Sequence, residues 1–110
     1  MPAIHKNLAK GHFSQMSLCE QMANIGSEVE RALNWKERKN DDYCQKAFER
    51  ALDLIEITIA GITDLSRLKE LSRVREALND YFRGDNQFLS TNASWKKYFM
   101  HFAFAARKFY

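Results

Sequence analysis

The sequence predicts an all-α protein, folded as an antiparallel up-down four-helix bundle. Turn formers are scarce, since the 110 residues include only 4 glycines and 1 proline, whereas a β-sandwich or barrel needs a turn roughly every ten residues. Apolar residues instead recur at the ~100° per residue of amphipathic helices, and the links between these segments are short, as between antiparallel neighbours. The hydrophobic content of 45% suffices for one core. We therefore expect a single bundle domain over residues 14–110 behind a flexible N-terminal arm, residues 1–13.

The first helix begins at Ser17, because Ser17 and Glu20 have the spacing of a capping box, in which each side chain accepts the other's backbone N–H. Gly26 lies beside the apolar stripe of this helix and allows a neighbouring backbone to approach closely. A charged stretch over residues 36–42 ends the helix. The stripe consists of Leu18, Met22, Ile25, Val29, Ala32 and Leu33.

The second helix covers residues 43–60, with Asp41 or Asp42 as its N-cap and Gly61 at its C-terminal end. Residues 55–59 alternate between apolar and polar like a strand, but the chain has no second run of this kind to pair with. We therefore expect helix here as well. The buried side consists of Cys44, Ala47, Phe48, Ala51, Leu52, Ile55 and Ile59.

The third helix begins after Thr63 or Asp64, either of which can cap it, and it ends at Gly84. Residues 85–92 are rich in Asp, Asn, Ser and Thr, which indicates a loop before the fourth helix. The apolar stripe of the third helix consists of Leu65, Leu68, Leu71, Val74, Leu78, Tyr81 and Phe82.

The fourth helix runs from about Ala93 to the C-terminus and is apolar on nearly every side. A helix that is hydrophobic all round is buried all round, yet only one side of it can face the core of one small bundle. Met100 and Phe104 point away from that side. We expect them, with His101, to form an association surface that a second copy, a different protein or the N-terminal arm covers. The inward residues are Trp95, Phe99, Phe102, Ala106, Phe109 and Tyr110.

Charge is unevenly distributed, because the formal net charge of +3 combines an acidic second helix with basic ends. The fourth helix carries Lys96, Lys97, Arg107 and Lys108 among aromatic residues. This combination suits single-stranded nucleic acid, whose phosphates meet cations and whose bases stack on rings. Arg107 and Lys108 equally fit the C-terminal end of a helix dipole.

Arg75 falls inside the apolar stripe of the third helix when the chain is projected at ~100° per residue. A guanidinium buried there needs a carboxylate, because an unpaired charge in a core is strongly destabilising. Glu28, at the border of the first helix's stripe, is the candidate partner in an ion pair that fixes helix register. The other hypothesis is an anion site, in which Arg75 binds a phosphate-like ligand.

No residue pattern predicts a catalytic, metal or cofactor site. Glu49, Asp53 and Glu56 share one face of the second helix, but the Glu-x-x-His motifs of di-iron bundles are absent, so we expect a solvated face or a docking strip for a basic partner. The histidines and the two cysteines, Cys19 and Cys44, lack metal-ligand spacing; the cysteines fit core positions in a reducing compartment. We expect a cytoplasmic protein, since neither a signal region nor a membrane-spanning run is evident.

The phrases that carry a family resemblance lie in the first two helices. They are residues 23–35, with Glu28-Val29-Glu30-Arg31-Ala32, and the opening Tyr43-Cys44-Gln45-Lys46-Ala47-Phe48-Glu49-Arg50-Ala51-Leu52 of the second helix. Over roughly residues 17–110, the order of segments resembles the small prokaryotic HEPN-type bundles and the helical partners of minimal nucleotidyltransferases. Residues 23–35 also look like those of small bacterial four-helix-bundle proteins of similar length.

This resemblance implies the fold and dimerisation. HEPN ribonucleases carry an Arg followed roughly four to six residues later by a His, and the pair cleaves RNA at a dimer cleft. Here Lys96 precedes His101 at that distance, and lysine lacks the bidentate fork that binds phosphate. The resemblance therefore implies no ribonuclease activity.

The sequence thus favours a non-enzymatic protein that acts by association through its fourth helix, as a homo-oligomer or as an accessory subunit. The alternative is a nucleic-acid or nucleotide-binding bundle that uses Arg75 or the basic fourth helix. A third hypothesis, a degenerate HEPN-like nuclease, depends on His101.

Overall fold

The computed structural model describes residues 11–108, and of Lys108 the backbone alone. It confirms the all-α class. The main helices are α2 (Leu18–Glu37), α3 (Asp41–Gly61), α4 (Leu65–Arg83) and α5 (Asn92–Lys108), and residues 11–14 are also helical. The strand-like run over residues 55–59 lies inside α3, as predicted. Within residues 11–108, no helix combines the length and apolar character that crossing a bilayer requires.

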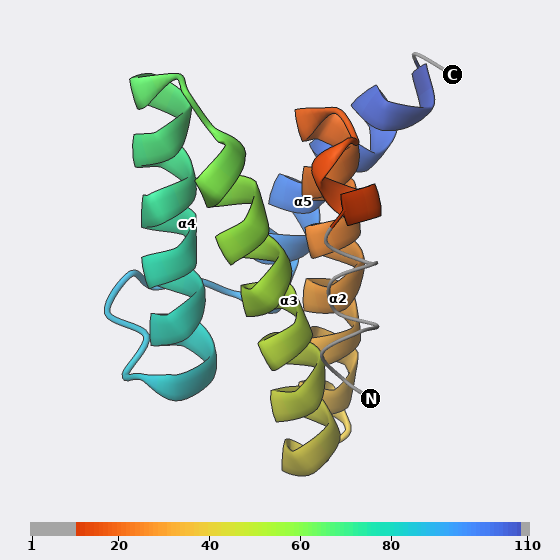
Figure 1. Cartoon of the computed structure of the whole chain (residues 1–110). Helices are drawn as coiled ribbons and strands as arrows, with labels where there is room; N and C mark the ends of the chain where they lie inside the picture. Colours follow the sequence, from red (N-terminus) through yellow and green to blue (C-terminus); the bar gives the residue numbers. More distant parts are fainter. Residues whose placement is uncertain (1–10, 109–110) are drawn as a thin grey trace.

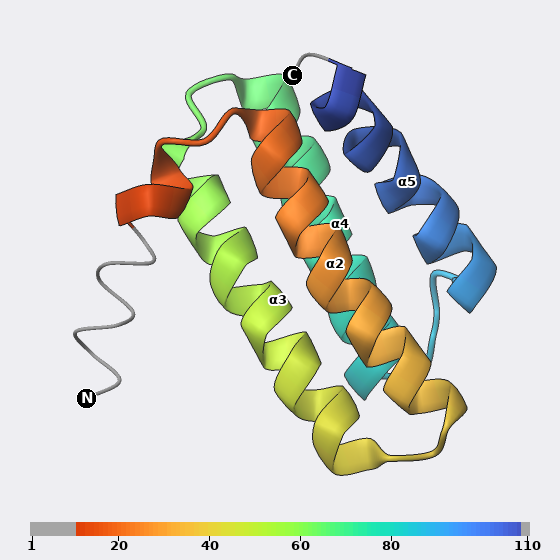
Figure 2. The same cartoon turned by 90° about the vertical axis from the view of Figure 1, so that its right-hand side faces the viewer.

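The central helix is α2, which packs against α3 on one side and α5 on the other, while α4 packs against α3 (Figures 1 and 2). The chain direction alternates from one helix to the next along the colour gradient (Figure 2). Side chains bridge α4 and α5: the Tyr98 hydroxyl donates to the Glu70 carboxylate at 2.9 Å, and the Tyr81 hydroxyl donates to the Asn92 side-chain carbonyl.

Two of the predicted N-caps are confirmed. The backbone N–H of Glu20 donates to the Ser17 hydroxyl at 3.2 Å, and the backbone N–H of Ser17 donates to the Glu20 carboxylate at 3.3 Å, which completes the capping box of α2. Asp64 caps α4. The predicted C-terminal ends also agree, since α3 ends at Gly61 and Gly84 is the C-cap of α4.

The N-cap of α3 is Asn40, and the prediction of Asp41 or Asp42 was wrong. The Asn40 side-chain oxygen accepts the backbone N–H of Tyr43 at 3.1 Å. Lys39, just before it, has a positive φ of 60°, so the turn closes one residue earlier than expected. Both aspartates then lie in the first turn of α3, where their charge favours the helix dipole.

The core begins earlier in the chain than predicted. Phe13, which the sequence places in the flexible arm, is buried, and the Gln21 side chain donates to its carbonyl oxygen at 3.0 Å. Residues 1–10 of that arm lie outside the described residues, as do Phe109 and Tyr110. The buried apolar residues are Phe13, Met22, Ile25, Val29, Ala32, Leu33, Cys44, Ala47, Phe48, Ala51, Ile55, Leu71, Val74, Ala77, Leu78, Trp95 and Phe99.

The start of the predicted stripe of α4 lies outside the core. Leu65, the first residue of α4, is exposed, and Leu68 is half-buried and does not belong to the core cluster.

Gly26 allows α5 to pack directly on α2, as the sequence predicted. A Cβ atom at Gly26 would lie 2.7 Å from Cβ of Phe99, much closer than carbon atoms pack. Phe99 is buried against α2. This contact positions the groove between α2 and α5.

Candidate association site

A groove of about 450 Å³ lies between α2 and α5. Helix α5 supplies one wall with Lys96, Met100, Ala103, Phe104 and Arg107. These residues are spaced three or four apart, so they share one face of the helix. Their centre is apolar and their two ends are basic.

Met100 and Phe104 are the projecting side chains of this wall, with 61% and 69% of their surfaces exposed. The sequence predicted both as part of an association surface, and the structure places both on the groove. His101, the third predicted member, is exposed but does not line the groove, because it lies about 100° further round the helix than Met100.

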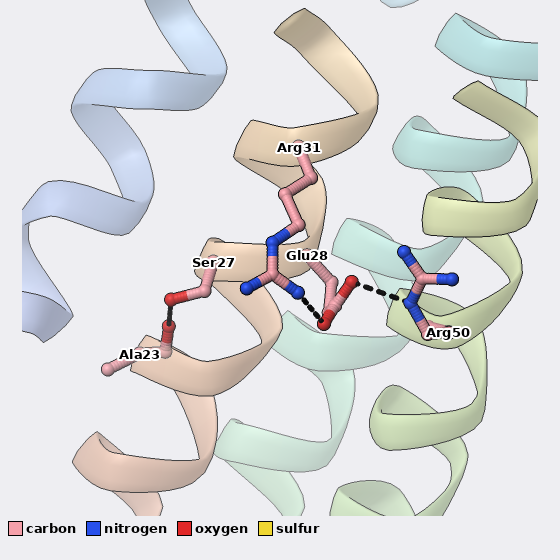
Figure 3. A network of polar contacts seen from close by, with 5 residues as sticks. All are labelled: Ala23, Ser27, Glu28, Arg31 and Arg50. Atoms are coloured by element: carbon pink, nitrogen blue, oxygen red, sulfur yellow. Dashed lines mark hydrogen bonds and ion pairs between the residues drawn. The ribbon is translucent and has the colours of Figure 1, made fainter. Parts of the chain in front are cut away.

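Helix α2 supplies the other wall, which includes Val29, Glu30 and Leu33 and is otherwise made of small residues. Ala23, Gly26 and Ser27 line it, and the Ser27 hydroxyl donates to the Ala23 carbonyl oxygen at 3.2 Å within the same helix (Figure 3). The hydroxyl is thus satisfied without a partner across the groove. Of the small residues, sequence reasoning identified only Gly26. The signal it missed is the spacing of the three small residues, which places them on one face of α2.

Charged residues stand at the ends of the groove. The Lys96 ammonium lies 3.7 Å from the Glu37 carboxylate, which also accepts the Asn92 side-chain N–H at 2.8 Å. The hydrogen bond from Asn92, together with the charge of Lys96, lowers the pKa of Glu37. Glu30 and Arg107 are exposed groove residues, and neither is in an ion pair with another part of residues 11–108. One groove end therefore offers a carboxylate and the other a guanidinium.

Glu28 is not the partner of Arg75, so this prediction was wrong. Glu28 binds two other arginines, with Oε1 2.9 Å from Nη1 of Arg31 and Oε2 3.0 Å from Nε of Arg50 (Figure 3). It therefore links α2 to α3. The physical reason is that α4, which carries Arg75, packs on α3, while the Glu28 carboxylate is held by Arg31 and by Arg50 of α3.

Arg75 instead pairs with Glu56 across the α3–α4 contact, at 2.7 Å between Nη1 and Oε1. Arg83 lies 3.5 Å from Glu49 in the same way. The acidic strip that the sequence predicted on the second helix, Glu49, Asp53 and Glu56, thus faces arginines of this chain at two of its members. The Arg75 guanidinium is held by a carboxylate of the neighbouring helix.

The basic residues of α5 serve different contacts. Lys96 and Arg107 line the groove, and Lys96 also pairs with Glu37. Lys97 is exposed and does not line the groove, and the Lys108 side chain lies outside the described residues. A nucleic-acid contact by these residues stays a prediction.

Both cysteines are free thiols, Cys44 buried and Cys19 half-buried. Burial raises the pKa of the Cys44 thiol, so this thiol stays protonated to higher pH. Among the residues that the structure describes, no group of three His, Cys, Asp or Glu side chains could hold a metal ion.

No protein-family model, curated protein or solved structure matches this chain. The resemblance to HEPN-type bundles therefore stays a prediction, and the groove is interpreted from its own geometry and chemistry.

Proposed function

We propose that this protein is not an enzyme and that it acts by association with a polypeptide segment held in the groove between α2 and α5. One observation carries the proposal: Met100 and Phe104 project, largely exposed, along a groove whose opposite wall is small at Ala23, Gly26 and Ser27. Large apolar side chains grouped at a concave surface are typical of protein interaction sites. An apolar helix face laid into such a groove is a common mode of recognition.

Covering Met100 and Phe104 would stabilise a complex. Covering a Phe or Met side chain contributes roughly 1.5–3 kcal/mol. Two such side chains therefore supply a substantial part of the about 8 kcal/mol of a micromolar complex. Tyr43, Leu65, Phe88 and Leu89 are also exposed, but none of them lines the groove. Scattered exposed apolar residues are normal on a protein surface.

Nucleic-acid binding is the second candidate, and the charges favour it less. Binding that depends on phosphates needs several cations facing one strand. Lys96 is engaged by Glu37, and Lys97 lies outside the groove face that carries Arg107. We also propose that the helices form an antiparallel up-down four-helix bundle and that the protein is cytoplasmic, as the sequence led us to expect.

A photo-crosslinking residue tests the proposal. We expect benzoylphenylalanine in place of Phe104 to form a covalent adduct with a polypeptide when cells that make the protein are irradiated, because the occupant of the groove lies against this position. The matched control carries the same residue in place of Leu89, which is 83% exposed and does not line the groove. Equal adduct yields at the two positions would show that the groove holds no protein.

A further inference from the structure

We propose that the occupant of the groove is a second copy of this chain, docked by a twofold axis with the two α5 helices antiparallel. This inference rests on the proposed function, because it names the partner of the same groove. In a twofold dimer the same surface of each subunit meets itself, so that surface must be self-complementary. The groove meets this condition in shape and in charge.

The two walls of the groove differ in shape. Met100 and Phe104 project from α5, whereas the α2 wall at Gly26 and Ser27 has no large side chain. Each copy can therefore insert its projecting side chains along the small wall of the other. The antiparallel arrangement also places Met100 opposite Phe104 of the second copy. Ala103, midway along this face of α5, is small enough to let the two helices approach.

The α2 wall supplies the negative charge that α5 lacks. Helix α5 has no acidic residue, so two α5 helices alone would bring cations together. In an antiparallel pairing centred between Met100 and Phe104, Arg107 of the second copy comes level with Lys97. Gly26 faces Phe99, and Glu30 lies one turn further along α2. Along the helix axis, Glu30 is therefore within about 3 Å of the level of Lys97.

Glu30 can therefore pair with Arg107 of the second copy, and the twofold axis forms this pair twice. Both residues line the groove, and both are exposed. The carboxylate at one end and the guanidinium at the other thus have a common explanation in a symmetric dimer.

The N-terminal arm fits the groove less well. The described chain begins at residue 11 on the α3 side of α2, whereas the groove lies on the α5 side (Figure 2). The arm would have to pass around α2 to reach it. A second copy approaches from solvent without that constraint.

Charge reversal with rescue tests the dimer. Sedimentation equilibrium of the full chain, from about 1 μM to about 500 μM, compares the wild type with Glu30→Arg, Arg107→Glu and the double variant. We expect the wild-type mass to rise with concentration from one copy towards two. Each single reversal replaces two attractive contacts by repulsive ones, so we expect the dimer Kd to rise roughly tenfold or more. The double variant exchanges the charges and returns the Kd to within about threefold of the wild type.

Matched reversals on α4 provide the control. Glu76→Arg and Arg73→Glu change charge by the same amount at exposed positions outside the groove, and we expect them to leave the Kd within about twofold of the wild type. The second copy is excluded if the wild type stays monomeric throughout, or if the double variant associates no better than the single ones. An adduct between position 104 and a different protein would also exclude it, while the proposed function would stand.

Discussion

Arg75 lies at a position within an apolar stripe, but its guanidinium reaches out of the stripe to pair with Glu56. The Cα of Arg75 lies among buried positions of α4, but its side chain is 37% exposed and that of Glu56 is 59% exposed. A long arginine can cover apolar surface with its stem and keep its guanidinium in water. Helical projection gives the angle of a residue and not the reach of its side chain. The sequence therefore predicted the position of Arg75 on the helix but not its partner.

We expect Arg75→Met to change the free energy of unfolding by less than about 1 kcal/mol, because solvent screens an exposed ion pair. Urea denaturation measures this, with Arg73→Met, an exposed arginine on the same helix, as the control. A loss above about 3 kcal/mol relative to that control would indicate a buried, structurally essential pair instead.

Tyr98 is the titratable residue most affected by the fold. Burial, followed by its hydrogen bond to Glu70, raises the pKa of Tyr98 far above its ordinary value. Because the folded pKa is raised, the stabilisation is fully present below the unfolded pKa of about 10 and is lost as pH rises towards the folded pKa.

We therefore expect Tyr98 to be the last tyrosine to ionise in an absorbance titration at alkaline pH. This last transition should vanish in Tyr98→Phe and remain in Tyr81→Phe. Tyr81 is the matched control because its hydroxyl bridges the same two helices through Asn92. An unchanged last transition in Tyr98→Phe would contradict the assignment.

At the scale of the helices, the contact between α2 and α5 depends on Gly26. Periodicity and caps were enough to predict the helices, including the start of α2 at Ser17 and of α4 at Asp64. The start of α3 was missed because it depends on the positive φ of Lys39, which no residue type at that position indicates. Which helix packs on which also escaped prediction, because amphipathic stripes of similar character can pair in several ways.

We expect Gly26→Ala to destabilise the fold by about 1–2 kcal/mol. The clash with Phe99 Cβ costs about 1–3 kcal/mol as overpacking, and the gain in helix propensity of up to about 1 kcal/mol offsets part of it. Gly61→Ala is the control, because a Cβ there meets nothing within 4 Å. Urea denaturation of both variants decides the matter: equal stability would mean that α5 does not press on Gly26.

At the scale of the molecule, the sequence predicted the α5 wall of the groove but not the α2 wall. The sequence indicated that Met100 and Phe104 cannot face the core of the same bundle, because they lie opposite its inward residues on the helix. It did not indicate that α2 would supply small residues and Glu30 beside them, since that follows from the way α5 crosses α2. The association surface therefore belongs to two helices that are far apart in the sequence.

The most direct test is the solution mass of Phe104→Ser beside that of the wild type and of Leu89→Ser, measured by sedimentation equilibrium across the same concentrations. Phe104 is 69% exposed and Leu89 83% exposed, so neither change should unfold the monomer. We predict that the wild type and Leu89→Ser dimerise alike, and that Phe104→Ser raises the dimer Kd at least about thirtyfold, as loss of a central interface residue does. Equal masses for all three proteins at every concentration would contradict association through this groove by a second copy.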